Sequence, residues 1–230
     1  MVANPQADRG EHEWLNEVED PYWMLDFGLE RSERKIRLFA VACVRRIWDS
    51  VNERLRKVVE VAEQYADGEV SLDVFETAYN FDELKAHGDK MWADPTIENR
   101  LQNCINVAVM QVTRPDPHAA KMAYEPTSRF FAITGDERGR NAERRNQCNL
   151  VRDIFGNLFR PVTIDRDSLK ANVVEIAHDI YQDRSFDRLW LLADALKQAG
   201  FTDSDLLAHC LEPGGHVRGC WVVDLILGNK

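Results

Sequence analysis

Apolar side chains repeat with the period of an α-helix along most of this chain, and this repeat is the strongest constraint on its fold. Between residues 33 and 51 they recur three, four and seven positions apart, at Ile36, Ala40, Cys43, Val44, Ile47 and Val51. Such spacing places them on one face of a helix. Phe39, Val41 and Trp48 widen that face, so we expect this helix to lie at the centre of the core.

Small polar residues indicate where further helices begin. Ser32, Asn52 and Ser71 each precede an apolar repeat and are good N-caps. Asp94-Pro95 is a cap followed by proline at the first helical position. Further repeats cover about 142–155, 168–181, 186–199, 204–211 and 217–227, whereas 159–164 is typical of one short extended segment. The sequence therefore predicts an all-α fold, either an irregular multi-helix bundle or a short helical array.

The helical repeat is interrupted once, near the middle of the chain. Arg114-Pro-Asp-Pro117 should end a helix, because proline disfavours the helical conformation in the residue before it. From there to residue 141 the chain has no clean period and carries Pro126, Gly135 and Gly139. We expect an N-terminal helical lobe (1–115), a loop-rich connection (116–141) and a C-terminal helical lobe (142–230). One continuous domain is the alternative.

Composition narrows the classes of protein to consider. The chain has 230 residues and a net charge of −10 at pH 7, which argues against a general nucleic-acid binder. No run approaches the ~20 apolar residues of a membrane-spanning helix, and the acidic first thirty residues do not resemble a signal peptide. Five scattered cysteines without a CxxC pair favour free thiols. We expect a cytoplasmic protein that binds a protein partner, in an oligomeric state that the sequence leaves open.

Four potential metal ligands gather near the C-terminus, namely His209, Cys210, His216 and Cys220. Thiolate and imidazole donors suit tetrahedral zinc, which makes a zinc site one hypothesis. Their spacing is not an established zinc pattern, however, and adjacent residues point about 100° apart on a helix. Ordinary packing of buried cysteines as small apolar residues is the favoured interpretation, so we expect no cofactor.

A third hypothesis makes Cys220 a nucleophile. If the last helix begins near His216, then His216, Cys220 and Asp224 lie four residues apart on one face. His216 would act as the base, and Asp224 would orient its imidazole. Pairs of this kind usually come together from distant segments, and the same stretch is also typical of a buried closing helix.

A second group of side chains could bind an anion. Two aromatic residues, Phe155 and Phe159, are flanked by four arginines, Arg144, Arg145, Arg152 and Arg160. Arginine beside aromatic rings can stack on bases or bind phosphate. The favoured alternative is that the two rings are core and the arginines pair with the acidic turn at 165–167, because arginine often bridges to carboxylates.

Four parts of the sequence carry a resemblance. They are residues 34–43 with 45–48, residues 150–162, residues 187–196, and the motif AHC at 208–210 followed by HVRGCWVVD at 216–224. Together they resemble a family of uncharacterised proteins that is abundant in planctomycete bacteria. The resemblance implies a shared fold and a bacterial cytoplasmic setting, and it implies no catalytic or binding residue. The chain departs from that family at Leu158 and Trp190, where proline is expected, and at Phe201, where cysteine is usual.

Two functions from different classes follow from these patterns. The leading one is a non-catalytic helical module that binds another protein, because no motif has the specificity that a catalytic assignment requires. The alternative is a metal-dependent or thiol-dependent hydrolytic enzyme centred on His209, His216, Cys220 and Asp224.

Overall fold

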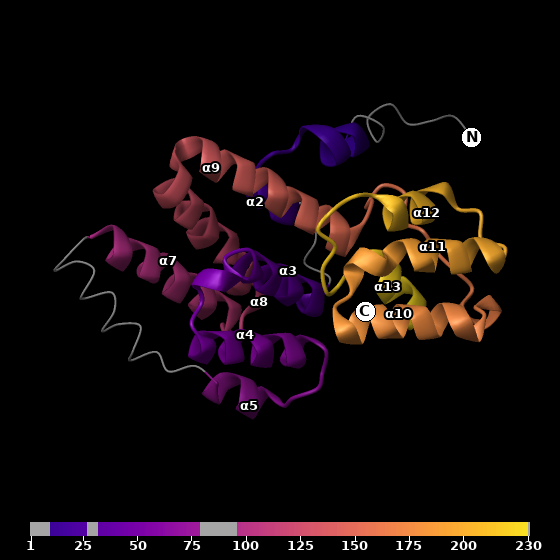
Figure 1. Ribbon diagram of the computed structural model, residues 1–230, viewed down its shortest axis with the longest axis horizontal. Helices are drawn as coiled ribbons and strands as arrows, with labels where there is room; N and C mark the ends of the chain where they lie inside the picture. Colours follow the sequence, from indigo (N-terminus) through magenta and orange to yellow (C-terminus); the bar gives the residue numbers. More distant parts are fainter. Residues whose placement is uncertain (1–9, 27–31, 79–95, 230) are drawn as a thin grey trace. The chain divides into compact units, whose positions relative to one another are not determined.

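The structure, a computed structural model, describes residues 10–26, 32–78 and 96–229 (Figure 1). Within these ranges the chain forms eleven α-helices joined by turns and short 3-10 segments, and it contains no strand. The predicted all-α fold is therefore confirmed. Residues 159–164, expected to be one short extended segment, form neither helix nor strand. In the part of the chain that is described, no helix is both long and apolar enough to cross a membrane.

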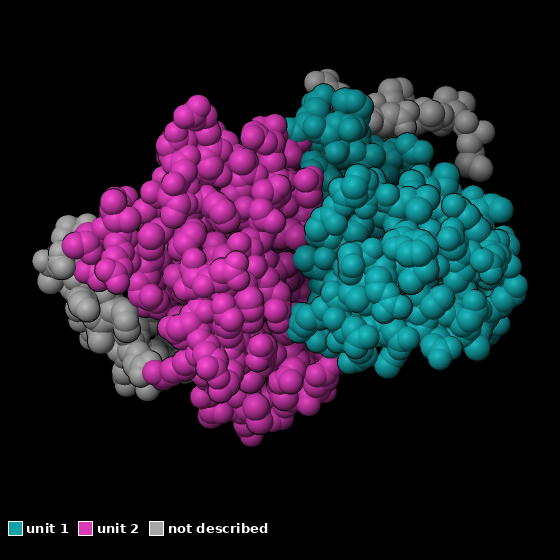
Figure 2. Space-filling model, in the orientation of Figure 1, with its two compact units in different colours: residues 1–17, 152–230 teal, residues 18–151 magenta. Residues whose placement is uncertain are grey.

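The chain divides into two compact units, coloured separately in Figure 2. Unit 1 comprises residues 1–17 and 152–230, and unit 2 comprises residues 18–151. The division falls inside a helix, α9 (Tyr124–Phe155), rather than in a loop-rich connection. Unit 1 is therefore discontinuous in sequence, because its N-terminal piece is separated from the rest by the whole of unit 2.

The expectation of a loop-rich segment at 116–141 is wrong. This stretch forms α8 (Pro117–Ala120), a 3-10 turn (Lys121–Ala123) and the first part of α9. The helix changes direction at Gly135 and Asp136, whose backbone angles are not helical. On either side of this bend the buried face is partly polar, and for that reason the sequence shows no clean apolar period.

Three polar residues tie together the two arms of α9. Ser128 and Gln147 are buried, and their side chains are 2.9 Å apart. The Gln147 amide also donates to the hydroxyl of Thr127 at 2.8 Å. The hydroxyl of Thr127 donates in turn to a carbonyl one helical turn earlier, and the single hydrogen of the Ser128 hydroxyl is shared between the carbonyl of Tyr124 and Oε1 of Gln147. Each buried polar group thus has a partner, and burying it carries little penalty.

The N-caps predicted from the sequence are confirmed in unit 2. Ser32, Asn52 and Ser71 each accept a backbone hydrogen bond at the start of α3 (Glu33–Arg45), α4 (Glu53–Ala66) and α5 (Leu72–Thr77). The helix expected after Asp94-Pro95 is α7 (Ile97–Val112), and Thr96 caps it. Asp94 and Pro95 themselves lie outside the described residues. A short helix, α2 (Pro21–Asp26), completes the unit.

Helix α3 forms the centre of unit 2, as its wide apolar face predicts. Every residue from Ile36 to Val44 is buried, and the helix contacts α4, α7 and α8. It ends at Arg45, earlier than expected, and a 3-10 turn (Trp48–Ser50) follows. Among its buried residues is one charge, Arg37, which donates hydrogen bonds to three carbonyl groups at the end of α7, those of Val112, Arg114 and Pro115.

Replacing Arg37 with methionine should lower the free energy of unfolding by about 3 kcal/mol. Methionine keeps most of the aliphatic stem, but it leaves buried carbonyl groups without their donor, at about 1–3 kcal/mol for each unsatisfied group. Urea denaturation of the purified chain measures the change. Arg138→Met is the matched control, because the ion pair of Arg138 with Asp136 is exposed and its loss should change little. Equal effects of the two substitutions would contradict this role for Arg37.

Unit 1 is built mainly from four helices, α10 (Ala171–Asp183), α11 (Leu189–Gln198), α12 (Ser204–Leu211) and α13 (Trp221–Leu227). They pack around one apolar cluster that includes Ile180, Leu192, Leu196, Leu206 and Ile226. A 3-10 turn, η5 (Phe186–Arg188), leads into α11. The last residues of α9 belong to this unit as well. Among them, Asp153 brings its carboxylate to His209 near the end of α12 and to Cys220 at the start of α13.

Candidate metal centre

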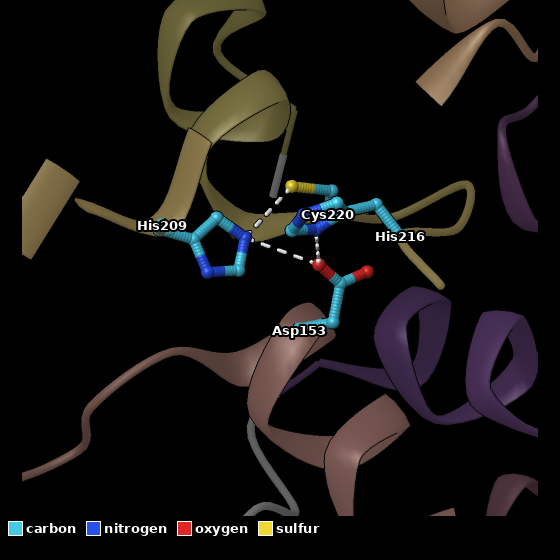
Figure 3. Close-up of side chains that lie close together, drawn as sticks. All are labelled: Asp153, His209, His216 and Cys220. Atoms are coloured by element: carbon cyan, nitrogen blue, oxygen red, sulfur yellow. Dashed lines mark hydrogen bonds and ion pairs between the residues drawn. The ribbon is translucent and has the colours of Figure 1, made fainter. Parts of the chain in front are cut away.

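Four side chains of unit 1 bring their donor atoms together at one point. They come from the last turn of α9 (Asp153), from α12 (His209), from the loop that follows (His216) and from the N-cap of α13 (Cys220). One ligand atom from each residue lies within 4.8 Å of the other three. Figure 3 shows a nitrogen of His209, a carboxylate oxygen of Asp153 and the sulfur of Cys220 facing one another, with the His216 ring beside them.

The chain around the cluster folds as its local sequence requires. Helix α12 ends at Leu211, because Glu212 precedes a proline and adopts an extended conformation. The loop then returns to the end of α9, where the N–H of Val217 donates to Oδ2 of Asp153 at 2.9 Å. A turn follows, in which Gly219 has a φ of 95° and the N–H of Cys220 donates to the carbonyl of Val217. This turn places the Cys220 sulfur at the start of α13.

The carboxylate of Asp153 is the centre of the cluster. Its Oδ1 atom lies 2.6 Å from Nδ1 of His216 and 3.1 Å from Nε2 of His209. Burial acts to raise the pKa of Asp153, but the hydrogen bonds and charges of the two histidines outweigh it, so the pKa is lowered. Asp153 is therefore a buried anion that both imidazoles face.

The hydrogen bonds of His216 fix which of its ring nitrogens can be a ligand. Its Nε2 atom lies 3.2 Å from the carbonyl oxygen of Glu212, which can only accept, so Nε2 carries the hydrogen. In neutral imidazole Nδ1 then has a lone pair directed at the Asp153 carboxylate. Burial acts to lower the pKa of His216, but the hydrogen bond and charge of Asp153 raise it. A positive charge at Nδ1, from either a proton or a metal ion, is therefore favoured.

A single nitrogen of His209 serves two neighbours. Its Nε2 atom lies 3.1 Å from Oδ1 of Asp153 and 3.2 Å from Sγ of Cys220. One N–H hydrogen cannot bond well to both, and a bare nitrogen would face the carboxylate without a hydrogen between them. The other ring nitrogen, Nδ1, lies 4.0 Å from the Glu212 carboxylate. The outer nitrogen of His216 is thus hydrogen-bonded to Glu212, that of His209 lies beyond hydrogen-bond distance of it, and the inner nitrogens of both face the cluster.

The two cysteines near the cluster are both buried thiols, but only one belongs to it. Burial and the charge of Asp153 raise the pKa of Cys220 well above its usual value and raise that of Cys210 to about 12. The side chain of Cys220 is fully buried. A buried neutral thiol is a poor nucleophile. All five cysteines of the chain are buried, and none of them forms a disulfide bond.

The structure places the residues of the zinc hypothesis differently from the sequence pattern. His209, His216 and Cys220 converge, whereas Cys210 lies outside the group and packs in the apolar cluster of unit 1. The expected face of His216, Cys220 and Asp224 does not form, because α13 begins at Trp221 and not near His216. The carboxylate beside His216 is that of Asp153, and Asp224 instead accepts a hydrogen bond from Asn229.

The four candidate anion-binding arginines do not form one group. Arg144 pairs with Asp20 and Glu125, and Arg145 pairs with Glu19, all within unit 2. In unit 1, Arg152 donates to the carbonyl of Trp14, and Arg160 pairs with Glu11. The expectation that these arginines pair with the turn at 165–167 is therefore not met for the contacts described here. Acids from the first twenty residues take that role instead for three of them.

Sequence reasoning missed Asp153, which is distant in sequence from the other three ligands. One signal could have pointed to it. Asp153 lies within the apolar stretch of Leu150, Val151 and Ile154, where a charged side chain must either be exposed or have buried partners.

The cluster can therefore exist in two chemical states, as hydrogen-bonded side chains or as the ligands of one metal ion. Its donor set is two imidazole nitrogens, one carboxylate oxygen and one sulfur, in a site whose side chains are all nearly buried.

The chain matches no protein-family model, no curated protein and no solved structure.

Proposed function

We propose that this chain is a zinc-binding protein with a non-catalytic role, in which one Zn²⁺ held by Asp153, His209, His216 and Cys220 stabilises unit 1 for binding a partner protein. One observation carries the proposal. Four donor atoms lie within 4.8 Å of one another, while the outer nitrogen of His216, Nε2, donates to the carbonyl of Glu212. Metal-ligating histidines usually have a carbonyl or carboxylate at the nitrogen that does not bind the ion, and His216 has this arrangement.

A metal ion accounts for the contacts of the cluster better than hydrogen atoms do. Nε2 of His209 lies near both Oδ1 of Asp153 and Sγ of Cys220. One positive charge between these three atoms would attract all of them. The Nδ1 atom of His216 needs a positive charge on the same side. A single cation in the middle of the donors meets both needs, and it replaces the thiol hydrogen of Cys220 when the sulfur binds as thiolate.

Zinc fits this donor set. Two neutral imidazoles, one thiolate and one carboxylate are zinc ligands, and their two negative charges balance those of Zn²⁺. A site of zero net charge is favourable where the side chains are removed from water. Calcium and magnesium prefer oxygen ligands, which supply only one of the four donors here.

The same geometry favours a structural role over a catalytic one. Four protein ligands complete a tetrahedron, whereas a catalytic zinc keeps one position for water or substrate. A thiol-dependent mechanism has less support. In a catalytic triad the acid lies at the nitrogen opposite to the one that faces the thiol, but here Nε2 of His209 faces both Asp153 and Cys220.

The test is the metal content of the purified full-length chain. Elemental analysis should find one zinc per chain after dialysis against metal-free buffer. Cobalt(II) exchanged into the site should show the intense visible absorption of a tetrahedral ion together with a thiolate-to-cobalt charge-transfer band. Cys220→Ser should abolish the charge-transfer band, and Cys210→Ser, the matched control, should keep it. A chain without bound metal, or a band that survives Cys220→Ser, would overturn the proposal.

A further inference from the structure

A cavity of about 330 Å³ opens beside the metal centre, and one of the proposed zinc ligands, His216, forms part of its wall. Its other walls come from the start of α11 with the preceding turn η5, and from the end of α12 with the turn that follows. The volume is at the lower end for ligand-binding pockets, with room for one long side chain. The whole cavity belongs to unit 1.

The lining of the cavity combines an apolar floor with an exposed apolar rim. Phe186 and Leu189 are buried beneath it. Trp190 and Leu211, which also line it, are 52% and 51% exposed. Other large apolar side chains of the described residues are exposed too, for example Trp23 and Ile97, but these two flank one opening. The surface therefore suits an aliphatic chain that packs against an indole ring.

The charge of the lining is negative. Asp187 contributes one carboxylate from η5, and Glu212 contributes another from the turn after α12. Among the described residues no lysine or arginine forms an ion pair with either carboxylate. The one lining residue that can be positive is His216, and both of its ring nitrogens already contact Asp153 and the Glu212 carbonyl. The Glu212 carboxylate lies 4.0 Å from Nδ1 of His209, too far for a hydrogen bond, so the cavity offers two carboxylates to a cation from outside.

We infer that this cavity binds the side chain of a lysine presented by a partner protein, which deepens the proposed function and rests on its partner-binding role. The four-carbon stem of lysine packs on Trp190 and Leu211, and an indole ring also attracts an ammonium group. The ammonium is compact and carries three N–H donors, so it can bridge carboxylates from two segments of the chain. A guanidinium is instead suited to forking onto a single carboxylate.

Two indole N–H signals in the ¹H–¹⁵N spectrum of the full-length, zinc-loaded chain can test this inference. The Trp190 signal is assigned by its loss in Trp190→Phe, and the Trp221 signal by its loss in Trp221→Phe. Nα-acetyl-lysine methylamide should shift the Trp190 signal in a saturable way. The norleucine analogue, which lacks the ammonium, should bind about tenfold more weakly, because a charged hydrogen bond contributes about one such factor.

Substitutions in the lining test the acidic and the apolar side chains of the cavity separately. Asp187→Asn should weaken binding of the lysine probe by about tenfold. Trp190→Leu, followed by calorimetry, should weaken it about two- to fivefold. Asp194→Asn is the matched control, because Asp194 is an exposed acid on α11 outside the cavity, and it should leave binding unchanged. Unchanged zinc content and melting temperature show that each variant is folded.

The outcomes distinguish this inference from the zinc proposal. The Trp221 ring centre lies 5.2 Å from that of His209, so its signal reports on the metal centre. Zinc that shifts the Trp221 signal, with no response of Trp190 to the lysine probe, would overturn the lysine site alone. Equal binding of lysine and norleucine, or tighter binding of the arginine analogue, would also overturn it. Failure of the chain to bind zinc would overturn the metal proposal, whatever the probe does.

Discussion

Removal of zinc should lower the melting temperature of this protein by about 10 °C. A ligand present at a thousand times its Kd stabilises the folded state by about 4 kcal/mol. For a chain of this size each kcal/mol corresponds to about 2–4 °C. The four ligands join the end of α9 to α12 and α13, so the loss should fall on unit 1.

Differential scanning calorimetry with and without a chelator measures the shift, and hydrogen exchange locates it. Amide protection should fall in α12 and α13 and stay unchanged in α3 and α4, which belong to unit 2 and serve as the internal control. Added Zn²⁺ should restore the original melting temperature, and Mg²⁺ should not. Identical melting curves before and after chelation would show that the cluster is held by hydrogen bonds alone.

The second large effect expected is an equal loss of stability in His216→Ala and Cys220→Ala. Each substitution removes one of four ligands, and because the ion's binding energy is folding energy, either loss dismantles the same site. Both variants should melt about 10 °C below the wild type, and a chelator should not lower the melting temperature of either variant further.

Cys210→Ala is the matched control for this pair. Cys210 is as deeply buried as a core residue but lies outside the ligand group, so its replacement should cost only packing, about 1–2 kcal/mol. If Cys220→Ala behaves like Cys210→Ala while His216→Ala is nearly silent, Cys220 is an ordinary core residue. The apolar residues that follow Cys220 in the sequence, considered by themselves, predict that outcome.

Local chemistry explains which features of the fold could be read from the sequence. The caps Ser32, Asn52 and Ser71 were predictable, because a cap depends only on a short polar side chain before an apolar repeat. The helical nature of 117–141 was not, because Ser128 is a buried polar residue whose partner, Gln147, is on the opposite arm of α9. A periodicity argument counts such residues as exposed.

The candidate site was predictable in part for a similar reason. His209, His216 and Cys220 are close in sequence and of the residue types that bind zinc, so they could be proposed together. Asp153 could not be grouped with these three residues from the sequence, since only the packing of α9 in unit 1 brings it close to them. The error over Asp224 came from the start of the last helix. A turn at Gly219 delays α13 to Trp221, which removes His216 from its face.

The discontinuity of unit 1 dictates an order of events during synthesis. The indole N–H of Trp14 donates to the carbonyl of Gly156, 142 residues later in the chain. At about 5–20 residues per second, the ribosome supplies this partner roughly 7–28 s after Trp14 itself. All of unit 2 emerges in that interval and has its complete sequence first. The segment around Trp14 must therefore wait for this partner, and the zinc ligands at 209, 216 and 220 are synthesised later still.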